Sequence, residues 1–218
     1  KNLKLAVMGG LPASETKYSV SEFKEMLSAY KDMDNGDIKQ NLREFIKEIM
    51  PVAEENNVKM GIHPDDPPIP LFGVPRIVST MDDYQYIFDS YDSPCNGMTF
   101  CAGSLASNFN NDVYKIFNKF KKRVNFIHLR NIKKEKDRKS FYESNHLKGD
   151  IDFVRLIKMI LKEEQRRSNI KKIEIPMRPD HGHSLLDDQS KKNFNPGYTA
   201  IGRLMGLSEL RGIIKAII

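Results

Sequence analysis

Two patterns of hydrophobic residues alternate along the chain. Short, mostly apolar runs predict β-strands, and the longer segments between them repeat apolar residues every three or four positions, which predicts amphipathic helices. Four such runs are expected to form strands: 58–62, 97–101, 124–129 and 172–175. Strands separated by helices are typical of an α/β fold in which crossover helices join the strands of a parallel sheet.

Local signals locate several helix ends. A capping box at 19–22 is expected to begin a helix through Tyr30, and a similar signature at 80–83 is expected to begin a helix through Tyr91. The run at 3–8 fits a short strand and the end of a helix equally well, so its pattern leaves both alternatives open.

Longer helices are expected from Asp37, over 111–122, after a cap at Asp150, and in the apolar tail to Ile218. Pro51 is expected to kink the first of these or to mark a second start. Their core-facing positions follow the helical period: Leu42, Phe45, Ile46, Ile49 and Val52; Val113, Ile116, Phe117 and Phe120; Val154, Ile157, Ile160 and Leu161.

Composition narrows the class of protein. The chain has 218 residues, of which 39% are hydrophobic and 29% charged, and this is enough for a single domain, 1–218, with its own core. No window approaches the ~20 apolar residues of a membrane span, and the amino end lacks the apolar region of a signal peptide. A cytoplasmic protein without a membrane partner is therefore expected.

The charge distribution, with a net charge of +6, and the two cysteines bear on two further classes, nucleic-acid-binding proteins and disulfide-stabilised proteins. Basic runs at 119–123 and 133–139 are not interleaved with glycines or aromatic residues, so they indicate a solvated surface rather than a nucleic-acid interface. Cys95 and Cys101 are too few to make a disulfide framework, and a reduced state is expected, with a disulfide between them as the alternative.

Metal-ligand residue types stand at the ends of the four expected strands. These residues are His63, Cys101, His128 and Asp180. Each alone could be a buried histidine, a small apolar cysteine or a loop carboxylate. In parallel α/β sheets, however, ligands bind beyond the carboxyl ends of the strands, where residues distant in sequence meet. We therefore expect these four side chains to form one site.

Two imidazoles, one thiolate and one carboxylate suit a divalent transition metal, and ligand softness alone favours zinc, iron or cobalt. A structural zinc site closed by four protein ligands is the competing interpretation. Nearby polar groups favour a catalytic metal site instead. Arg130 and Arg178 could hold a carboxylate, and His181 and Tyr198 could transfer protons.

Seven motifs in order resemble those of mannonate dehydratase. They lie at 62–68 (Ile-His-Pro-Asp-Asp-Pro-Pro), 75–80 (Pro-Arg-Ile-Val-Ser-Thr), 100–104 (Phe-Cys-Ala-Gly-Ser), 128–130 (His-Leu-Arg), 146–150 (His-Leu-Lys-Gly-Asp), 177–183 (Met-Arg-Pro-Asp-His-Gly-His) and 195–203 (Asn-Pro-Gly-Tyr-Thr-Ala-Ile-Gly-Arg). The resemblance implies a (β/α)8 TIM barrel and a metal that is usually Mn²⁺, with Fe²⁺ or another divalent transition metal as alternatives. Residues matching His63, Cys101, His128 and Asp180 hold that metal in the family.

The reaction that the resemblance implies is the loss of water from D-mannonate to give 2-keto-3-deoxy-D-gluconate, a hydro-lyase step in hexuronate catabolism. His181 and Tyr198 are then the acid and base pair, and which takes which proton stays open. Arg130 and His146 are the candidates for holding the sugar acid, and His183 is placed outside the reacting groups.

Family members are substantially longer than this chain. By the resemblance, 3–8 is the end of a helix, and only about four of the eight strands of a TIM barrel are present, those of the carboxyl-terminal half. Such a half-barrel needs the missing amino-terminal half, from a longer protein, or a partner such as a second copy of the chain, to cover its edges. Another metal-dependent barrel isomerase of sugars and an inactive remnant are the alternative functions.

Overall fold

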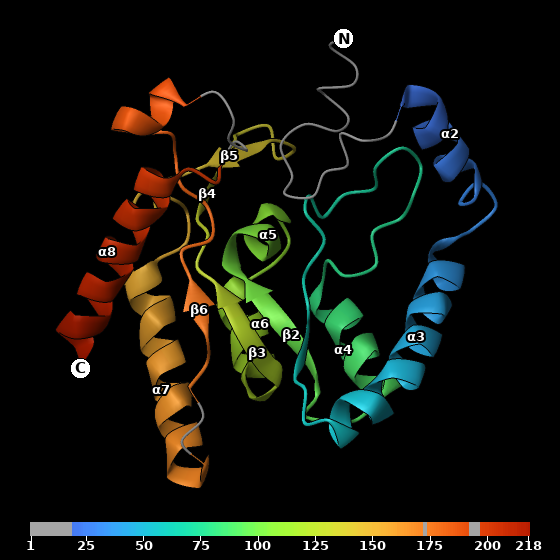
Figure 1. The fold of residues 1–218 in the computed structure, drawn as a ribbon, viewed down its shortest axis with the longest axis horizontal. Coiled ribbons are helices and arrows are strands. Elements are labelled where there is room, and N and C mark those ends of the chain that lie inside the picture. Colours follow the sequence, from blue (N-terminus) through green and yellow to red (C-terminus); the bar gives the residue numbers. More distant parts are fainter. Residues whose placement is uncertain (1–18, 172–173, 192–196) are drawn as a thin grey trace.

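Four parallel strands form one sheet, and they lie side by side in the order in which they occur in the chain (Figure 1). They are β1 (Met60–Ile62), β2 (Asn96–Cys101), β3 (Val124–His128) and β6 (Met177–Arg178). The computed structural model describes residues 19–171, 174–191 and 197–218, so the run at 3–8 lies outside the described residues. The expected α/β fold with a parallel sheet is confirmed.

The two predicted capping boxes are present. Ser19 and Glu22 cap α2 (Val20–Ser28), and Thr80 and Asp83 cap α4 (Met81–Ser90) in the same reciprocal way. In each, the first side chain accepts a hydrogen bond from a backbone N–H of the first turn, and the second side chain accepts one from the backbone N–H of the cap residue. Both helices end one or two residues before the predicted position.

Helix α3 (Asn35–Glu55) is longer than expected. Asp34 caps it, so the helix starts before Asp37, and Pro51 lies inside it without ending it. The prediction that Phe45 and Val52 face the core is wrong, because their side chains are 57% and 59% exposed. These two residues are seven positions apart and share one side of the helix, and the core covers only the side that carries Ile46.

Between β2 and β3, the chain forms α5 (Ala102–Ser107), α6 (Val113–Phe120) and the short 3₁₀-helix η1 (Lys121–Arg123). The four predicted core positions of α6 are all buried, and Asp112 caps the helix. Helix α5 is not predicted. All of its residues are small or apolar and buried, so it shows no contrast between an apolar and a polar face.

The segment 131–149, which is rich in charged residues, contains an antiparallel hairpin that the hydrophobic pattern does not predict. Its strands are β4 (Ile132–Lys134) and β5 (Phe141–Glu143). The buried amide of Asn131 closes the base of this segment. Its nitrogen donates to the carbonyl oxygens of His146 (2.7 Å) and Ile151 (2.9 Å), and its oxygen accepts from the backbone N–H groups of Ile132 and Ile151.

Substituting Asn131 tests this closure. Asn131→Asp is expected to lower the free energy of unfolding by about 2–4 kcal/mol, because two buried carbonyl oxygens would lose their donor and face a carboxylate instead. Chemical denaturation measures the change. Asn118→Asp is the matched control, since Asn118 is exposed on α6 and its one hydrogen-bond partner in the described part of the chain is the Lys121 side chain. Equal stability of the two variants would contradict the assigned role of Asn131.

Helix α7 (Phe153–Lys171) begins at a different aspartate from the one predicted. Asp152 accepts a hydrogen bond from the backbone N–H of Arg155 (3.0 Å), whereas Asp150 accepts from Lys134 in the hairpin (2.9 Å). Ile157 and Ile160 are buried as predicted, but Val154 is 45% exposed, so its predicted core position is wrong. The buried side of the helix runs instead through Phe153, Leu156, Ile157 and Ile160, and Val154 lies outside it.

The fourth strand lies further along the chain than predicted. Positions 172–173 lie outside the described residues, and 174–175 form no ladder. Instead, β6 pairs with β3 through the carbonyl oxygens of Pro176 and Arg178, which accept from the N–H groups of Ile127 and Leu129 at 2.9 Å. Pro176 takes part in this pairing although it has no N–H to donate, because its carbonyl oxygen still accepts.

The chain ends with the 3₁₀-helix η2 (Leu186–Ser190) and α8 (Ala200–Ile217). The start of α8 packs against the turn that follows β6 with almost no space between the two backbones, and a Cβ atom on Gly202 would overlap the backbone of Gly182 and His183. Thr199 donates a hydrogen bond from its hydroxyl to the carbonyl oxygen of His183 (2.6 Å). This contact joins the last helix to the strand end.

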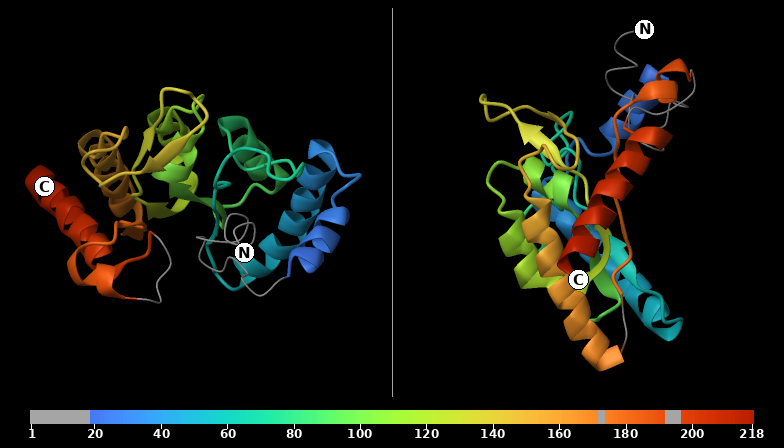
Figure 2. Two further views of the ribbon diagram at one scale, coloured as in Figure 1. Left: turned by 90° about the horizontal axis from the view of Figure 1, so that it is seen from above. Right: turned by 90° about the vertical axis from the view of Figure 1, so that its left-hand side faces the viewer.

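The core lies between the sheet and the helices. Side chains alternate along each strand, so Met98, Phe100 and Ile127 are buried in the helix-facing core while Thr99 and Cys101 point to the other face. Seen from above, the elements follow an arc from α3 at one end to α7 and α8 at the other (Figure 2). Among the described helices, none is both long and apolar enough to cross a bilayer.

Candidate metal centre and proton-transfer pair

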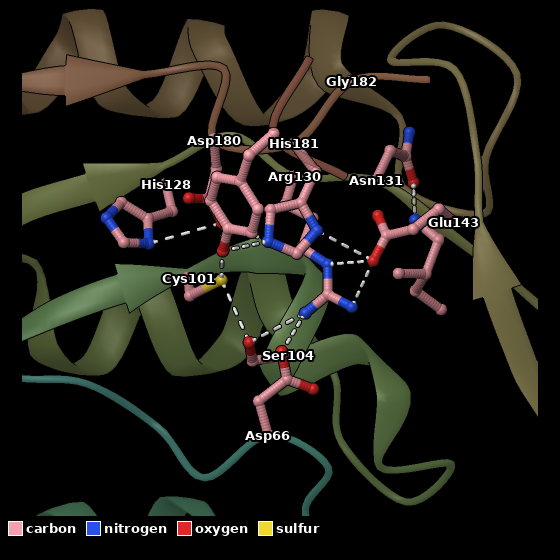
Figure 3. A network of polar contacts seen from close by, with 12 residues as sticks. Asp66, Cys101, Ser104, His128, Arg130, Asn131, Glu143, Asp180, His181 and Gly182 are labelled. Atoms are coloured by element: carbon pink, nitrogen blue, oxygen red, sulfur yellow. Dashed lines mark hydrogen bonds and ion pairs between the residues drawn. The ribbon is translucent and has the colours of Figure 1, made fainter. Parts of the chain in front are cut away.

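Three of the four predicted metal ligands meet at the carboxyl ends of the strands. His63 follows β1, Cys101 ends β2 and His128 ends β3, where it pairs in register with Cys101. Their ligand atoms lie within 4.8 Å of one another. Asp180, two residues after β6, lies beside them, with its Oδ2 3.5 Å from Nδ1 of His128 and 4.0 Å from the Cys101 sulfur (Figure 3).

His63 presents a free lone pair to this cluster. Its Nδ1 lies 2.7 Å from the carbonyl oxygen of Pro64, an atom that can only accept, so Nδ1 carries the proton. Nε2 is therefore unprotonated in the neutral ring, and it lies 3.2 Å from Nδ1 of His128. Metal-ligating histidines usually donate their other ring N–H to a carbonyl or carboxylate in this way.

The described environment favours uncharged forms of Cys101 and His128 in the absence of a cation. Burial, with the Asp180 carboxylate, raises the pKa of the Cys101 thiol to about 12, and Ser104 Oγ lies 3.1 Å from its sulfur. Burial lowers the pKa of His128 to about 4, which leaves its ring neutral. A neutral imidazole can bind a metal directly, and a bound cation would stabilise the thiolate. The donor set therefore fits a divalent transition metal.

Asp180 is held in a special backbone conformation. Its φ is 69°, in the left-handed region that few residues other than glycine adopt. This turn brings its carboxylate back to the strand ends, where it is buried. Arg178 donates to Oδ1 at 2.8 Å, so Oδ2 is left to face the histidines.

His181 and Tyr198, the predicted acid and base pair, are in direct contact. The hydroxyl oxygen of Tyr198 lies 2.7 Å from Nε2 of His181. Burial, with the Asp180 carboxylate, raises the pKa of Tyr198 to about 12, so the hydroxyl keeps its proton at neutral pH and donates it to the ring. The opposite ring nitrogen, Nδ1, lies 2.9 Å from Oε1 of Glu143.

Arg130, predicted to hold the substrate, is buried and engaged by other side chains of the chain. It forms ion pairs with Asp66 and Glu143, donates from Nε to Glu143 at 2.7 Å, and donates to Ser104 at 3.2 Å. A substrate oxygen would have to share this guanidinium with two carboxylates. Its role as a substrate contact stays a prediction.

His146, the other predicted substrate contact, is buried behind the turn after β6. Its Nε2 lies 2.9 Å from the carbonyl oxygen of Pro179, and its ring packs so closely on α8 that a Cβ atom on Gly206 would overlap it. His146 therefore supports the backbone next to Asp180. Its substrate role is also left as a prediction.

A pocket of about 410 Å³ opens over the cluster, within the range of roughly 300–1,000 Å³ typical of small-molecule sites. Its lining includes three of the predicted ligands, both members of the predicted proton-transfer pair, and two arginine side chains. The lining residues are His63, Pro64, Asp65, Asp66, Arg76, His128, Arg178, Asp180, His181 and Tyr198. His146 is not among these described lining residues.

Several polar residues of the site were not singled out from the sequence. Asp66, Arg76 and Ser104 lie inside the motifs at 62–68, 75–80 and 100–104, so those motifs contained a signal for them. Glu143 had no such signal, because it reaches the site only through the β4–β5 hairpin. Cys95 and Cys101 are both free, which excludes the alternative of a disulfide between them.

Comparisons with known proteins identify the family. The family model for D-mannonate dehydratase (UxuA) matches residues 1–218. Mannonate dehydratase from Chromohalobacter salexigens is 46% identical over 211 residues, which cover 97% of this chain and 54% of the relative. Mannonate dehydratase from a Marinomonas species is 42% identical over 208 residues, covering 95% and 53%.

The fold also resembles a solved structure, the crystal structure of mannonate dehydratase from Streptococcus suis serotype 2. The TM-score is 0.78 at 32% sequence identity, covering 97% of this chain and 56% of that one. The chain thus spans about half the length of the relatives it matches. Since a family model matches all of it and the same family recurs among these relatives, the chain belongs to the D-mannonate dehydratase family.

Proposed function

We propose that this chain carries the metal site and the proton-transfer pair of an enzyme that dehydrates D-mannonate to 2-keto-3-deoxy-D-gluconate. The observation that carries the proposal is the meeting of the His63, Cys101 and His128 donor atoms, with Asp180 beside them, next to the pocket that His181 and Tyr198 line. Family membership supports the same reaction.

His63, Cys101, His128 and Asp180 would hold the metal. The thiol favours a softer ion on chemical grounds, while the family resemblance favours Mn²⁺, with Fe²⁺ as the alternative. When bound, a divalent cation stabilises the negative charge that develops on substrate oxygens as the proton at C2 leaves. Arg178 keeps Asp180 oriented toward this position through its 2.8 Å hydrogen bond.

His181 and Tyr198 would move the protons. Dehydration requires that one group remove the proton from C2 and that another donate a proton to the hydroxyl leaving C3. In the resting geometry the proton lies on Tyr198, and Nε2 of His181 has a lone pair to accept one. Both groups line the pocket, so each can reach a bound sugar acid.

The substrate carboxylate would bind on the basic side of the pocket. Arg178 has a side chain that is 51% exposed. Arg76 also lines the pocket, and its buried Nε has no hydrogen-bond partner among the described residues. Two guanidinium groups at one pocket suit a small anionic substrate.

The four strands would be consecutive strands of a (β/α)8 barrel, with 1–218 as part of a single domain. Their sequential order and the arc of Figure 2 fit part of a closed barrel. The face of the sheet away from the core borders a groove of about 860 Å³, which is lined by strand residues such as Gly61, Thr99 and Phe126 and also by residues of α7 such as Arg167 and Ile170. The other half of a barrel, from a longer protein, or a second copy would cover this face.

The function is tested with D-mannonate and Mn²⁺, using this chain and any longer protein that contains it. The expected product is a 2-keto-3-deoxy acid, which is detected colorimetrically after periodate oxidation and identified by mass, 18 Da below the substrate. A keto sugar formed without loss of water would favour the isomerase alternative. A chain that binds no divalent metal, by elemental analysis after loading and desalting, would favour the inactive remnant.

A further inference from the structure

Glu143 reaches the site from the end of the β4–β5 hairpin. Its Oε1 lies 2.9 Å from Nδ1 of His181 and 2.7 Å from Nε of Arg130 (Figure 3). Its backbone is fixed as well, because β5 pairs with β4 in the register that places Glu143 opposite Ile132. The carboxylate is therefore held against one side of the His181 ring.

The charge of Glu143 decides which ring nitrogen of His181 carries the proton. Burial would raise the pKa of Glu143, but the hydrogen bonds from His181 and Arg130 outweigh it and lower the pKa. An ionised carboxylate can only accept, so the proton lies on Nδ1. In the neutral ring, Nε2 then presents its lone pair to the hydroxyl of Tyr198, 2.7 Å away.

A competing arrangement is available to this ring. Nε2 of His181 also lies 3.6 Å from Oδ2 of Asp180. If Nδ1 lost its acceptor, the proton could move to Nε2 and pair with that carboxylate instead. Nε2 would then be unable to accept from Tyr198, and Asp180 would be drawn away from His63 and His128.

We propose that Glu143 is a positioning residue that fixes the ring and the proton of His181, so that Nε2 faces Tyr198 and the pocket. Its consequence for turnover rests on the proposed function, whereas the position of the proton does not. Arg130 takes part through Glu143. It joins this carboxylate to Asp66 and to Ser104, whose hydroxyl lies beside the Cys101 sulfur, and so connects the proton-transfer pair to the candidate metal ligands.

The proton position is measured directly by ¹⁵N NMR of the histidine side chains in the metal-free chain, with His181 assigned by comparison with His181→Ala. We expect Nδ1 to be protonated in the unaltered chain. Glu143→Ala is expected to move His181 toward the Nε2-protonated form. Glu143→Gln is expected to restore the original form, because its amide oxygen can accept from Nδ1.

Asp66→Asn is the matched control. It removes the other carboxylate partner of Arg130 and leaves the contact between Glu143 and His181 in place, so the His181 spectrum should not change. If Glu143→Ala folds and keeps the Nδ1 proton, the proposal is overturned. If that variant does not fold, the unaltered chain decides, since an Nε2-protonated His181 there contradicts the proposal and an Nδ1-protonated one supports it.

Kinetics give a second readout in a protein that turns over mannonate. Glu143→Ala is expected to lower kcat about 100-fold with KM little changed, because it disturbs proton transfer rather than binding, and Glu143→Gln is expected to recover most of the loss. Failure of the proposed function would appear as no turnover in the unaltered protein with the NMR result intact. A raised KM with kcat unchanged would instead overturn the positioning role.

Discussion

Replacing Cys101 with serine is expected to lower the affinity of the chain for Mn²⁺ by at least about 100-fold. Removing a group that only supports a ligand typically costs 10–100-fold in metal affinity, and loss of a ligand should cost no less. Cys101 is buried at the centre of the cluster, within 4.8 Å of the donor atoms of both histidines. A hydroxyl at this place ionises far less readily than a thiol. Calorimetric titration with Mn²⁺ measures the affinity.

Cys95→Ser is the matched control for this experiment. Cys95 is also buried and unpaired by any disulfide, but it precedes β2, at the opposite end of that strand from Cys101. A similar loss of affinity in both variants would point to general damage to the fold. Unchanged Mn²⁺ affinity in Cys101→Ser would show that Cys101 is not a ligand. It would favour the alternative that Cys101 is an ordinary small buried residue of the core.

His181→Ala is expected to lower turnover by about 10²–10⁴-fold while the metal stays bound, in a protein that turns over D-mannonate. The ring of His181 contacts Tyr198 and Glu143, and it is not a member of the cluster of donor atoms. Asp180→Ala, by contrast, is expected to lose both metal and turnover. Metal content and initial rates, measured on the same preparations, separate the two outcomes.

His183→Ala provides the control, because the ring of this histidine, two residues further along, has one described hydrogen-bond partner, the backbone oxygen of Glu143. Its turnover should stay close to that of the unaltered protein. If His181→Ala also lost its metal, the division between a metal site and a proton-transfer pair would be wrong.

The grouping of ligand-type residues at the strand ends could be predicted from the sequence, because it depends only on the strands being parallel. Parallel strands end at the same edge of a sheet, so a ligand-type residue at each end must lie near the others. His63, Cys101 and His128 meet for this reason. The capping boxes of α2 and α4 were equally predictable, because each depends only on residues three positions apart.

Other parts of the site depend on contacts that no local pattern records. The β4–β5 hairpin lies in a charged segment, and its pairing brings Glu143 to His181, 38 positions away in the sequence. The partners of Arg130 come from the loop after β1 and from β5, so a guanidinium that looked free to bind substrate is engaged by the chain itself. Helical periodicity likewise could not tell which side of α3 the core would cover.

The close approach of Gly202 to Gly182 means that the position of α8 determines the geometry of the proposed proton-transfer pair. Tyr198 bridges to Gly182 just before α8 begins, and His181 immediately precedes that glycine. The distance between the His181 ring and the Tyr198 hydroxyl therefore depends on how closely the backbones at Gly182 and Gly202 approach each other. A side chain at Gly182 or Gly202 would push α8 away from the turn after β6. The His181 ring and the Tyr198 hydroxyl would then lie too far apart for a hydrogen bond.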